Sequence, residues 1–168
     1  VTFSDGAVDR IIQLTACQPY FVQMVCHNVV TVLNRQRTTY VAQSSVEAAA
    51  QETLTSADGH MRFMFESAGS RVKQAILVYV ASSLLQPGAL PIHEIEAFVT
   101  RNTLSVSRAE LEEALREFAD RDIVRIQGSM GNRLYGFKID LVRQWIRRNY
   151  DLRSAIALAQ DASYIREG

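Results

Sequence analysis

The chain has 168 residues, 48% of them apolar, and its 18 basic residues balance 18 acidic ones to give a net charge of zero. This balance excludes the overall electropositive excess that is usual in a nucleic-acid-binding domain. The apolar runs fall short of the roughly 18–20 residues that cross a bilayer, so we expect no membrane partner. The length suffices for one ordinary hydrophobic core or for two small ones, and we favour two small helical units.

The chain has two cysteines, Cys17 and Cys26, which are too few for the disulfide framework of a secreted mini-domain. A basic segment followed by an apolar core, the mark of a signal peptide, does not open the sequence. We therefore expect a cytoplasmic protein in a reducing compartment. Because the chain begins at Val1 without an initiator methionine, we also expect it to be a piece of a longer protein.

Residues 1–54 are predicted to form a small bundle of helices. The first helix follows Ser4 or Asp5, either of which can serve as its N-cap, and it ends in a loop over residues 15–18. The apolar positions that define the buried face of this helix are Val8, Ile11 and Ile12.

Pro19 opens the second helix, because a proline in the first turn of a helix loses no hydrogen bond. Adjacent apolar rows follow it and predict that this helix is largely buried. A turn at 34–39 and an extended piece at 40–41 come next, and a capping box at 44–47 predicts a third helix that reaches residue 54. The rows consist of Phe21, Val25, Val29 and Val32, flanked by Val22, Cys26, Val30 and Leu33.

Residues 55–69 are predicted to be a partly ordered connector that is helical in its middle. A cluster of aromatic and methionine side chains at 61–65 favours docking of the connector onto a neighbouring unit. His60 lies in the same segment and has no partner that the sequence reveals.

The order of elements predicted for residues 70–150 is that of a winged-helix domain. Three helices come first, and the third opens with a capping box formed by Ser107 and Glu110. Two β-rich runs then flank a glycine-bearing loop, which predicts a β-hairpin, the wing. The helices span about 72–84, 91–99 and 107–118, the strands 123–127 and 133–139, and a closing helix 141–150, before a helical tail or linker at 151–168.

The run from Leu14 to Gln23 carries the family signal. Thr15, Gln18, Pro19 and Tyr20 match the lid motif Thr-Gly-Gly-x-Pro-Tyr of bacterial STAND and AAA-type ATPases, and Phe21, Gln23, Cys26 and His27 continue in the same way. The chain thus resembles the lid plus winged-helix portion of these signalling ATPases. This implies a mainly α fold, with a small helical lid bundle followed by a winged-helix domain with one β-hairpin.

The resemblance implies that Pro19, Tyr20 and Gln18 lie near a nucleotide, with Pro19 reporting the nucleotide state to the lid. ATP or ADP with Mg²⁺ would be bound by a preceding nucleotide-binding domain of the same chain, and no cofactor by this part itself. Ala16 and Cys17 replace the two glycines of the motif. A side chain at position 17 would weaken or alter nucleotide sensing, because the backbone usually approaches closely there.

Without the resemblance, Pro19 is an ordinary helix-start proline and Tyr20 a cover for the core of the lid. Neither interpretation predicts catalysis. A phosphate-binding loop ends in Gly-Lys-Ser/Thr, whereas the only lysines, Lys73 and Lys138, follow valine and phenylalanine. The start of a zinc-protease helix at His93 lacks its second histidine, since position 97 is alanine. We expect no catalytic site and no metal site.

Charge is divided within the predicted winged helix. Residues 104–122 hold three arginines against six acidic residues, whereas residues 123–150 hold six basic residues against one acidic residue. DNA phosphates would be repelled by the first segment, where a recognition helix would lie. In the DNA-binding alternative, contacts come from Arg125, Arg133 and Lys138 on the wing. The separation of charge suits protein docking better.

We therefore expect a non-catalytic regulatory part of a multidomain STAND or AAA-type ATPase, which couples nucleotide state to domain rearrangement and protein interactions. Its expected partners are the preceding nucleotide-binding domain and other proteins or further copies of the chain. Two alternatives stay open. One is a winged-helix DNA-binding module, whose binding would weaken steeply with salt. The other is a protein-interaction or oligomerisation scaffold without any link to a nucleotide.

Overall fold

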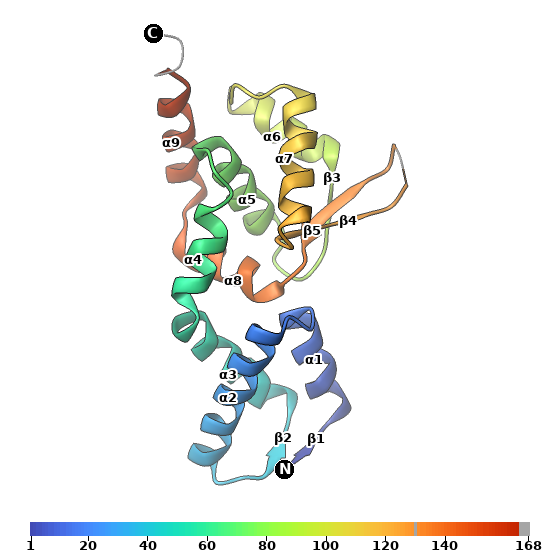
Figure 1. Ribbon diagram of the computed structural model, residues 1–168, viewed down its shortest axis with the longest axis vertical. Coiled ribbons are helices and arrows are strands. Elements are labelled where there is room, and N and C mark those ends of the chain that lie inside the picture. The colour runs from blue at the N-terminus through green and yellow to red at the C-terminus, as the bar shows by residue number, and fades with distance from the viewer. Residues whose placement is uncertain (130, 165–168) are drawn as a thin grey trace. The chain divides into compact units, whose positions relative to one another are not determined.

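The computed structural model describes residues 1–129 and 131–164, and these residues form nine helices and five short strands (Figure 1). This confirms the prediction of a mainly α fold. The chain divides into two compact units, which are described separately below. Unit 1 consists of residues 1–62 and 139–141, and unit 2 of residues 63–138 and 142 onwards. The division at 62 and 63 falls inside the segment predicted to be a connector.

Unit 1 is built from three helices and a parallel pair of two-residue strands. Helix α3 packs against both α1 and α2, and β1 pairs with β2 in the register Thr2 to Tyr40 and Phe3 to Val41. The bounds are β1 Thr2–Phe3, α1 Asp5–Thr15, α2 Pro19–Gln36, β2 Tyr40–Val41 and α3 Gln43–Ser56, after which α4, Asp58–Glu66, crosses into unit 2. The predicted partly ordered connector is thus helical over most of its length.

The buried face of α1 differs from the predicted one. Ser4 caps the helix as expected, with its Oγ accepting a hydrogen bond from Ala7 N. However, Val8 and Ile12 are 44% and 48% exposed. The buried row contains Ala7, Ile11 and Leu14, at the i, i+4, i+7 spacing of a helix. The expectation for Val8 and Ile12 was therefore wrong, because the face of α1 that is buried contains Ala7 and Leu14 instead.

The start of α3 also differs from the prediction. Its N-cap is Ala42, without a side-chain cap, so the capping box expected at 44–47 is wrong. Ser45 is buried in the first turn, and Glu47 instead pairs with Arg10, whose Nε lies 2.6 Å from Glu47 Oε1. A tertiary ion pair has replaced the local cap.

The α2 helix buries one predicted row, Phe21, Val25, Val29 and Val32, but Val30 of the flanking row is 53% exposed. The interface with α3 also contains a buried polar contact. Asn28 Nδ2 donates to Thr53 Oγ1 at 2.9 Å and to Ser56 Oγ at 3.2 Å. Because a buried amide without partners is costly, this contact fixes how α2 lies on α3.

Unit 2 contains the remaining elements in the order α5, β3, α6, α7, β4, β5, α8 and α9. Strands β4 and β5 form the predicted hairpin, and β3 pairs with β5 to make a three-stranded antiparallel sheet. The bounds are α5 Arg71–Ser83, β3 Leu90–Pro91, α6 Ile92–Arg101, α7 Arg108–Asp120, β4 Val124–Gln127, β5 Leu134–Phe137, α8 Asp140–Asn149 and α9 Leu152–Tyr164.

The predicted third helix of unit 2 is confirmed in detail. Helix α7 starts with the capping box of Ser107 and Glu110, and its buried residues are Leu111, Ala114, Leu115 and Phe118. The segment predicted as a tail or linker contains α9, which packs alongside α5 (Figure 1). Strand β3 was not predicted, because it is two residues long and contains Pro91, which cannot donate to a ladder.

One glycine of the sheet is required by close backbone contact. A Cβ atom at Gly136 would lie 2.0 Å from the carbonyl oxygen of Gly88. The loop before β3 therefore crosses β5 at a point where only a glycine fits.

Candidate functional site

The turn between α1 and α2 contains two consecutive left-handed residues that are not glycine. Ala16 has a φ of 48° and Cys17 a φ of 58°. Thr15 is fully buried; its hydroxyl donates to Ile11 O at 2.7 Å and accepts from Cys17 N at 3.3 Å. The turn is closed by a bond from Gln18 N to Thr15 O at 2.9 Å. Thr15 thus holds the turn from inside the unit.

The three residues predicted to lie near a nucleotide follow directly after this turn. Gln18 is the N-cap of α2 and is half-buried; its carbonyl accepts a hydrogen bond from Val22 N at 2.9 Å. Pro19 occupies the first turn of α2, as expected, and is exposed. Tyr20 is 38% exposed. The turn therefore presents Pro19 and Tyr20 at the surface of unit 1.

The aromatic side chains beside the turn pack against a residue from α4. The ring centroids of Tyr20 and His60 lie 4.4 Å apart, and Phe21 meets His60 edge-on at 5.4 Å. The expectation that His60 lacks a partner was wrong. Its partners come from a helix forty residues earlier in the chain, and a contact at that separation leaves no local signal in the sequence.

The chemistry offered by this surface is apolar and aromatic. Cys17, Pro19, Tyr20 and His60 are all exposed at the turn or beside it, and none of them carries a fixed positive charge. Such a surface can contact a planar base or the side chains of a protein, but it has no arginine or lysine to hold a phosphate group.

The three basic residues of the DNA-binding alternative do not all lie on one face of unit 2. Arg125 pairs with Gly136 in the β4–β5 register. Tyr135 and Arg133 alternate with Gly136 along the chain, so they belong to the other face of the hairpin, and they line a cavity beside α7. Lys138 lies at the base of the hairpin and forms an ion pair with Asp122. Arg125 and Lys138 thus have the same parity in the hairpin, because Lys138 lies opposite Ile123, whereas Arg133 lies apart from them at the cavity.

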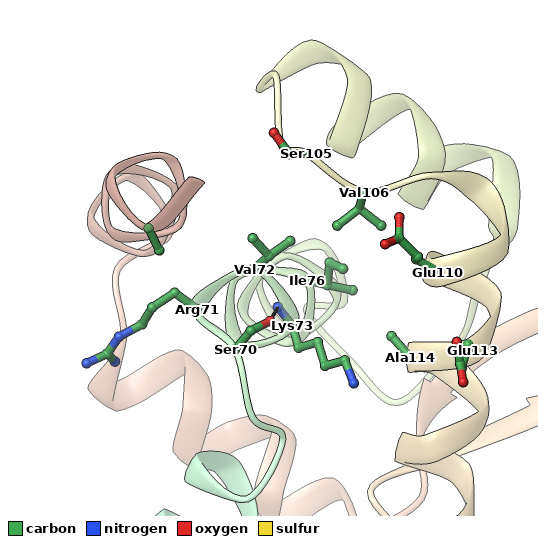
Figure 2. A pocket seen from close by; sticks show the side chains of 11 residues that line it. Ser70, Arg71, Val72, Lys73, Ile76, Ser105, Val106, Glu110, Glu113 and Ala114 are labelled. Carbon is green, nitrogen blue, oxygen red and sulfur yellow. Dashed lines mark hydrogen bonds between the residues drawn. The ribbon is translucent and has the colours of Figure 1, made fainter. Parts of the chain in front are cut away.

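A cavity of about 430 Å³ lies between α5, α7 and the loop that precedes α7. Figure 2 shows Val72 and Ile76 projecting from α5 toward this space, with Val106 and Ala114 on the opposite side. Its charged rim is largely engaged in local contacts: Lys73 Nζ lies 2.5 Å from Glu117 Oε2, and Glu110 belongs to the capping box. Contact with Lys73 lowers the pKa of the Glu117 carboxyl below its ordinary value.

Within residues 1–129 and 131–164, no group of three or more histidine, cysteine, aspartate and glutamate side chains is placed to hold a metal ion. Among the helices described here, none combines the length and the apolar character needed to cross a membrane. No family model matches the chain, and neither a curated protein nor a solved structure matches it.

Proposed function

We propose that this chain is a non-catalytic regulatory part of a STAND or AAA-type ATPase, in which the α1–α2 turn contacts a nucleotide-binding domain and reports its nucleotide state. The observation that supports this proposal is the backbone of Ala16 and Cys17. The family motif has glycines, which adopt left-handed conformations readily, at both positions, and here Ala16 and Cys17 are left-handed in succession without being glycine.

This conformation is costly for residues with a Cβ atom. Each left-handed residue other than glycine costs about 1–2 kcal/mol relative to a right-handed one. Such strain persists only where surrounding contacts impose it, and it is concentrated at functional positions. Here the buried Thr15 hydroxyl and the α1 carbonyls supply those contacts. The retained turn therefore favours a role for the shape of residues 15–20.

The packing of unit 1 offers a route from the turn to the rest of the unit. Pro19 is rigid in φ and begins α2, so a shift of the turn is transmitted directly to that helix. Tyr20 is backed by His60 and Phe21. The buried contact of Asn28 with α3 then ties the movement of α2 to that of α3. Val8 and Ile12, exposed on α1, are suited to contact with a protein neighbour.

The arrangement of unit 2 supports the winged-helix part of the proposal. Its order of α5, β3, α6, α7, β4 and β5, with a three-stranded antiparallel sheet, is the order that the sequence predicted for a winged helix with one additional short strand. The exposed carboxylates of α7, including Glu113 and Asp120, favour protein contact over contact with DNA on that helix.

The proposal is tested by nucleotide binding in the complete gene product that contains this chain. ATP and ADP affinities are measured by calorimetry for the native protein and for Pro19→Ala, after equal thermal stability has been established. The matched control is Pro87→Ala, at another exposed proline. We expect Pro19→Ala to change the ratio of the ATP and ADP affinities severalfold and the control to leave it unchanged. A gene product that binds neither nucleotide contradicts the proposal.

A further inference from the structure

We propose that unit 2 binds a compact phosphate-bearing ligand between α7 and the β4–β5 hairpin, with Arg116 and Arg133 contacting the phosphate. The site is a cavity of about 260 Å³ that is separate from the α1–α2 turn. Its lining consists of Arg108, Glu112 and Arg116 from α7, Gly131 and Arg133 from the hairpin loop, and Tyr135 and Ile92. It is the meeting of these cations from two elements that suggests a ligand.

The arginines that line the cavity differ in whether a carboxylate neutralises their charge. Arg108 Nε lies 3.1 Å from Glu112 Oε1 and 3.1 Å from Glu96 Oε1, and these carboxylates raise the pKa of its guanidinium. By contrast, neither Arg116 nor Arg133 has an ion-pair or hydrogen-bond partner among the residues that the structure describes. Glu96 and Glu112 thus pair with Arg108, and the other two guanidinium groups keep their donors available within the described part of the chain.

The helical repeat places Arg116 on the same side of α7 as Arg108. Arg108, Glu112 and Arg116 are spaced four residues apart, so they lie along one side of α7. Arg133, the residue before β5, lines the same cavity, as does Tyr135 within that strand. A cleft with free cations on both walls can hold an anion between them.

The charge and shape of the cavity favour a phosphate group. A phosphate monoester carries about −1.5 to −2 charges at neutral pH, which matches two free guanidinium groups, whereas a carboxylate matches only one. Each guanidinium can donate two parallel hydrogen bonds to phosphate oxygens. The side chains of Tyr135 and Ile92 add an apolar wall for the organic part of the ligand. The volume limits this part to a small group, because pockets for drug-sized ligands begin near 300 Å³.

The surroundings argue against a nucleic-acid duplex in the same place. A duplex lying along α7 would also meet its exposed carboxylates, among them Glu113 and Asp120. Phosphates spaced along a duplex would be repelled by them. The cavity itself is lined by one carboxylate of α7, that of Glu112, which is paired with Arg108. The ligand that fits is therefore a compact one.

The test is a titration of the 168-residue chain with phenyl phosphate, followed by amide and arginine side-chain shifts in ¹H–¹⁵N NMR spectra. The variants are Arg116→Gln and Arg133→Gln. The control Arg125→Gln removes the same charge from the same hairpin at a position outside the cavity. Spectra outside the hairpin and α7 must match those of the native chain, which establishes folding. Arg133→Lys keeps the positive charge but removes the paired N–H donors of the guanidinium group.

We expect saturable binding that is weakened at least about tenfold by Arg116→Gln and by Arg133→Gln, less by Arg133→Lys, and not by Arg125→Gln. Tighter binding of phenyl phosphate than of inorganic phosphate indicates an organic monoester as the ligand; equal binding indicates free phosphate. The proposal is overturned if phenyl phosphate does not bind, or if all glutamine variants weaken binding equally. It is also overturned if a DNA duplex binds more tightly than phenyl phosphate.

Discussion

Two tight turns of the molecule reach left-handed backbone conformations in different ways. The β4–β5 hairpin uses glycines, Gly128 with a φ of 89° and Gly131 with a φ of 98°. The α1–α2 turn uses Ala16 and Cys17 instead, and relies on the buried Thr15 for support. Glycine makes the first turn a local property of the sequence, whereas the second is imposed by the packing of unit 1. Arg37, Thr103 and Asp122 also have a positive φ, each as a single residue, whereas the α1–α2 turn holds two such residues in succession. This turn is the proposed sensing surface.

The largest effect is expected from adding a side chain to the hairpin turn. In Gly128→Ala, the new Cβ would lie 2.3 Å from Asn132 O, in addition to the strain of a positive φ. We expect a loss of more than about 2 kcal/mol in the stability of unit 2. Denaturation followed by the fluorescence of Trp145, the single tryptophan, measures it. Gly131→Ala is the matched control, since its Cβ meets nothing within 4 Å and only the strain of about 1 kcal/mol remains.

A smaller loss is expected from removing the internal support of the α1–α2 turn. Thr15→Val keeps the shape of the side chain but removes the bonds to Ile11 O and Cys17 N. We expect a loss of about 1–2 kcal/mol and faster hydrogen exchange of the turn amides. The control Thr31→Val removes a bond of the same kind, to His27 O, on an exposed face of α2. Equal losses in the two variants would mean that Thr15 does not specifically hold the turn.

Restoring a glycine of the motif should stabilise the fold, whereas Gly128→Ala in the hairpin destabilises it. Cys17→Gly relieves left-handed strain but increases the freedom of the unfolded chain, so we expect a net gain of about 0.5 kcal/mol. Cys17→Ala keeps the strain and should change stability little. Thermal unfolding followed by circular dichroism compares the two. A clear destabilisation by glycine at this position would show that the turn is not strained.

The smallest effect is expected from the ion pair of Lys73 with Glu117 in unit 2, which involves no backbone strain. The pKa of Glu117 is lower in the folded state than in the unfolded state, so its carboxylate stabilises the fold at pH values above the unfolded-state pKa. This stabilisation is lost as the pH falls through the folded-state pKa. Both side chains are partly exposed, so the contribution is small. We expect Lys73→Met to flatten the decline in stability between neutral and acidic pH. An unchanged pH profile in this variant would contradict the assignment of Lys73 as the cause.

Local signals made parts of both units predictable. The capping box of Ser107 and Glu110 and the apolar spacing behind it identified α7, and Pro19 marked the start of α2. The glycines of the 128–132 loop identified the hairpin. Each of these features depends on residues within one turn or one helix face, which is why the sequence alone sufficed.

The features that escaped prediction depend on contacts between distant segments. Val8 resembles a core residue by its type, but Ala7 is the residue that is buried in unit 1. The left-handed turn at Ala16 contains no glycine from which it could have been predicted. The aromatic partner of His60 lies on another helix. Arg116, which has no ion-pair partner among the residues described, was predicted only as part of an acidic helix. Its spacing of eight residues from Arg108 was the signal that the two arginines lie on one face of that helix.

The central claim, that the α1–α2 turn reports nucleotide state, is tested most directly by amide hydrogen exchange in the complete gene product. Exchange of residues 16–22 is compared in the presence of ATP and of ADP, with the hairpin turn at 128–132 as an internal reference. The account expects different protection of Cys17 and Gln18 in the two nucleotide states and no difference in the hairpin turn. Identical exchange of residues 16–22 in a protein saturated with each nucleotide would contradict it.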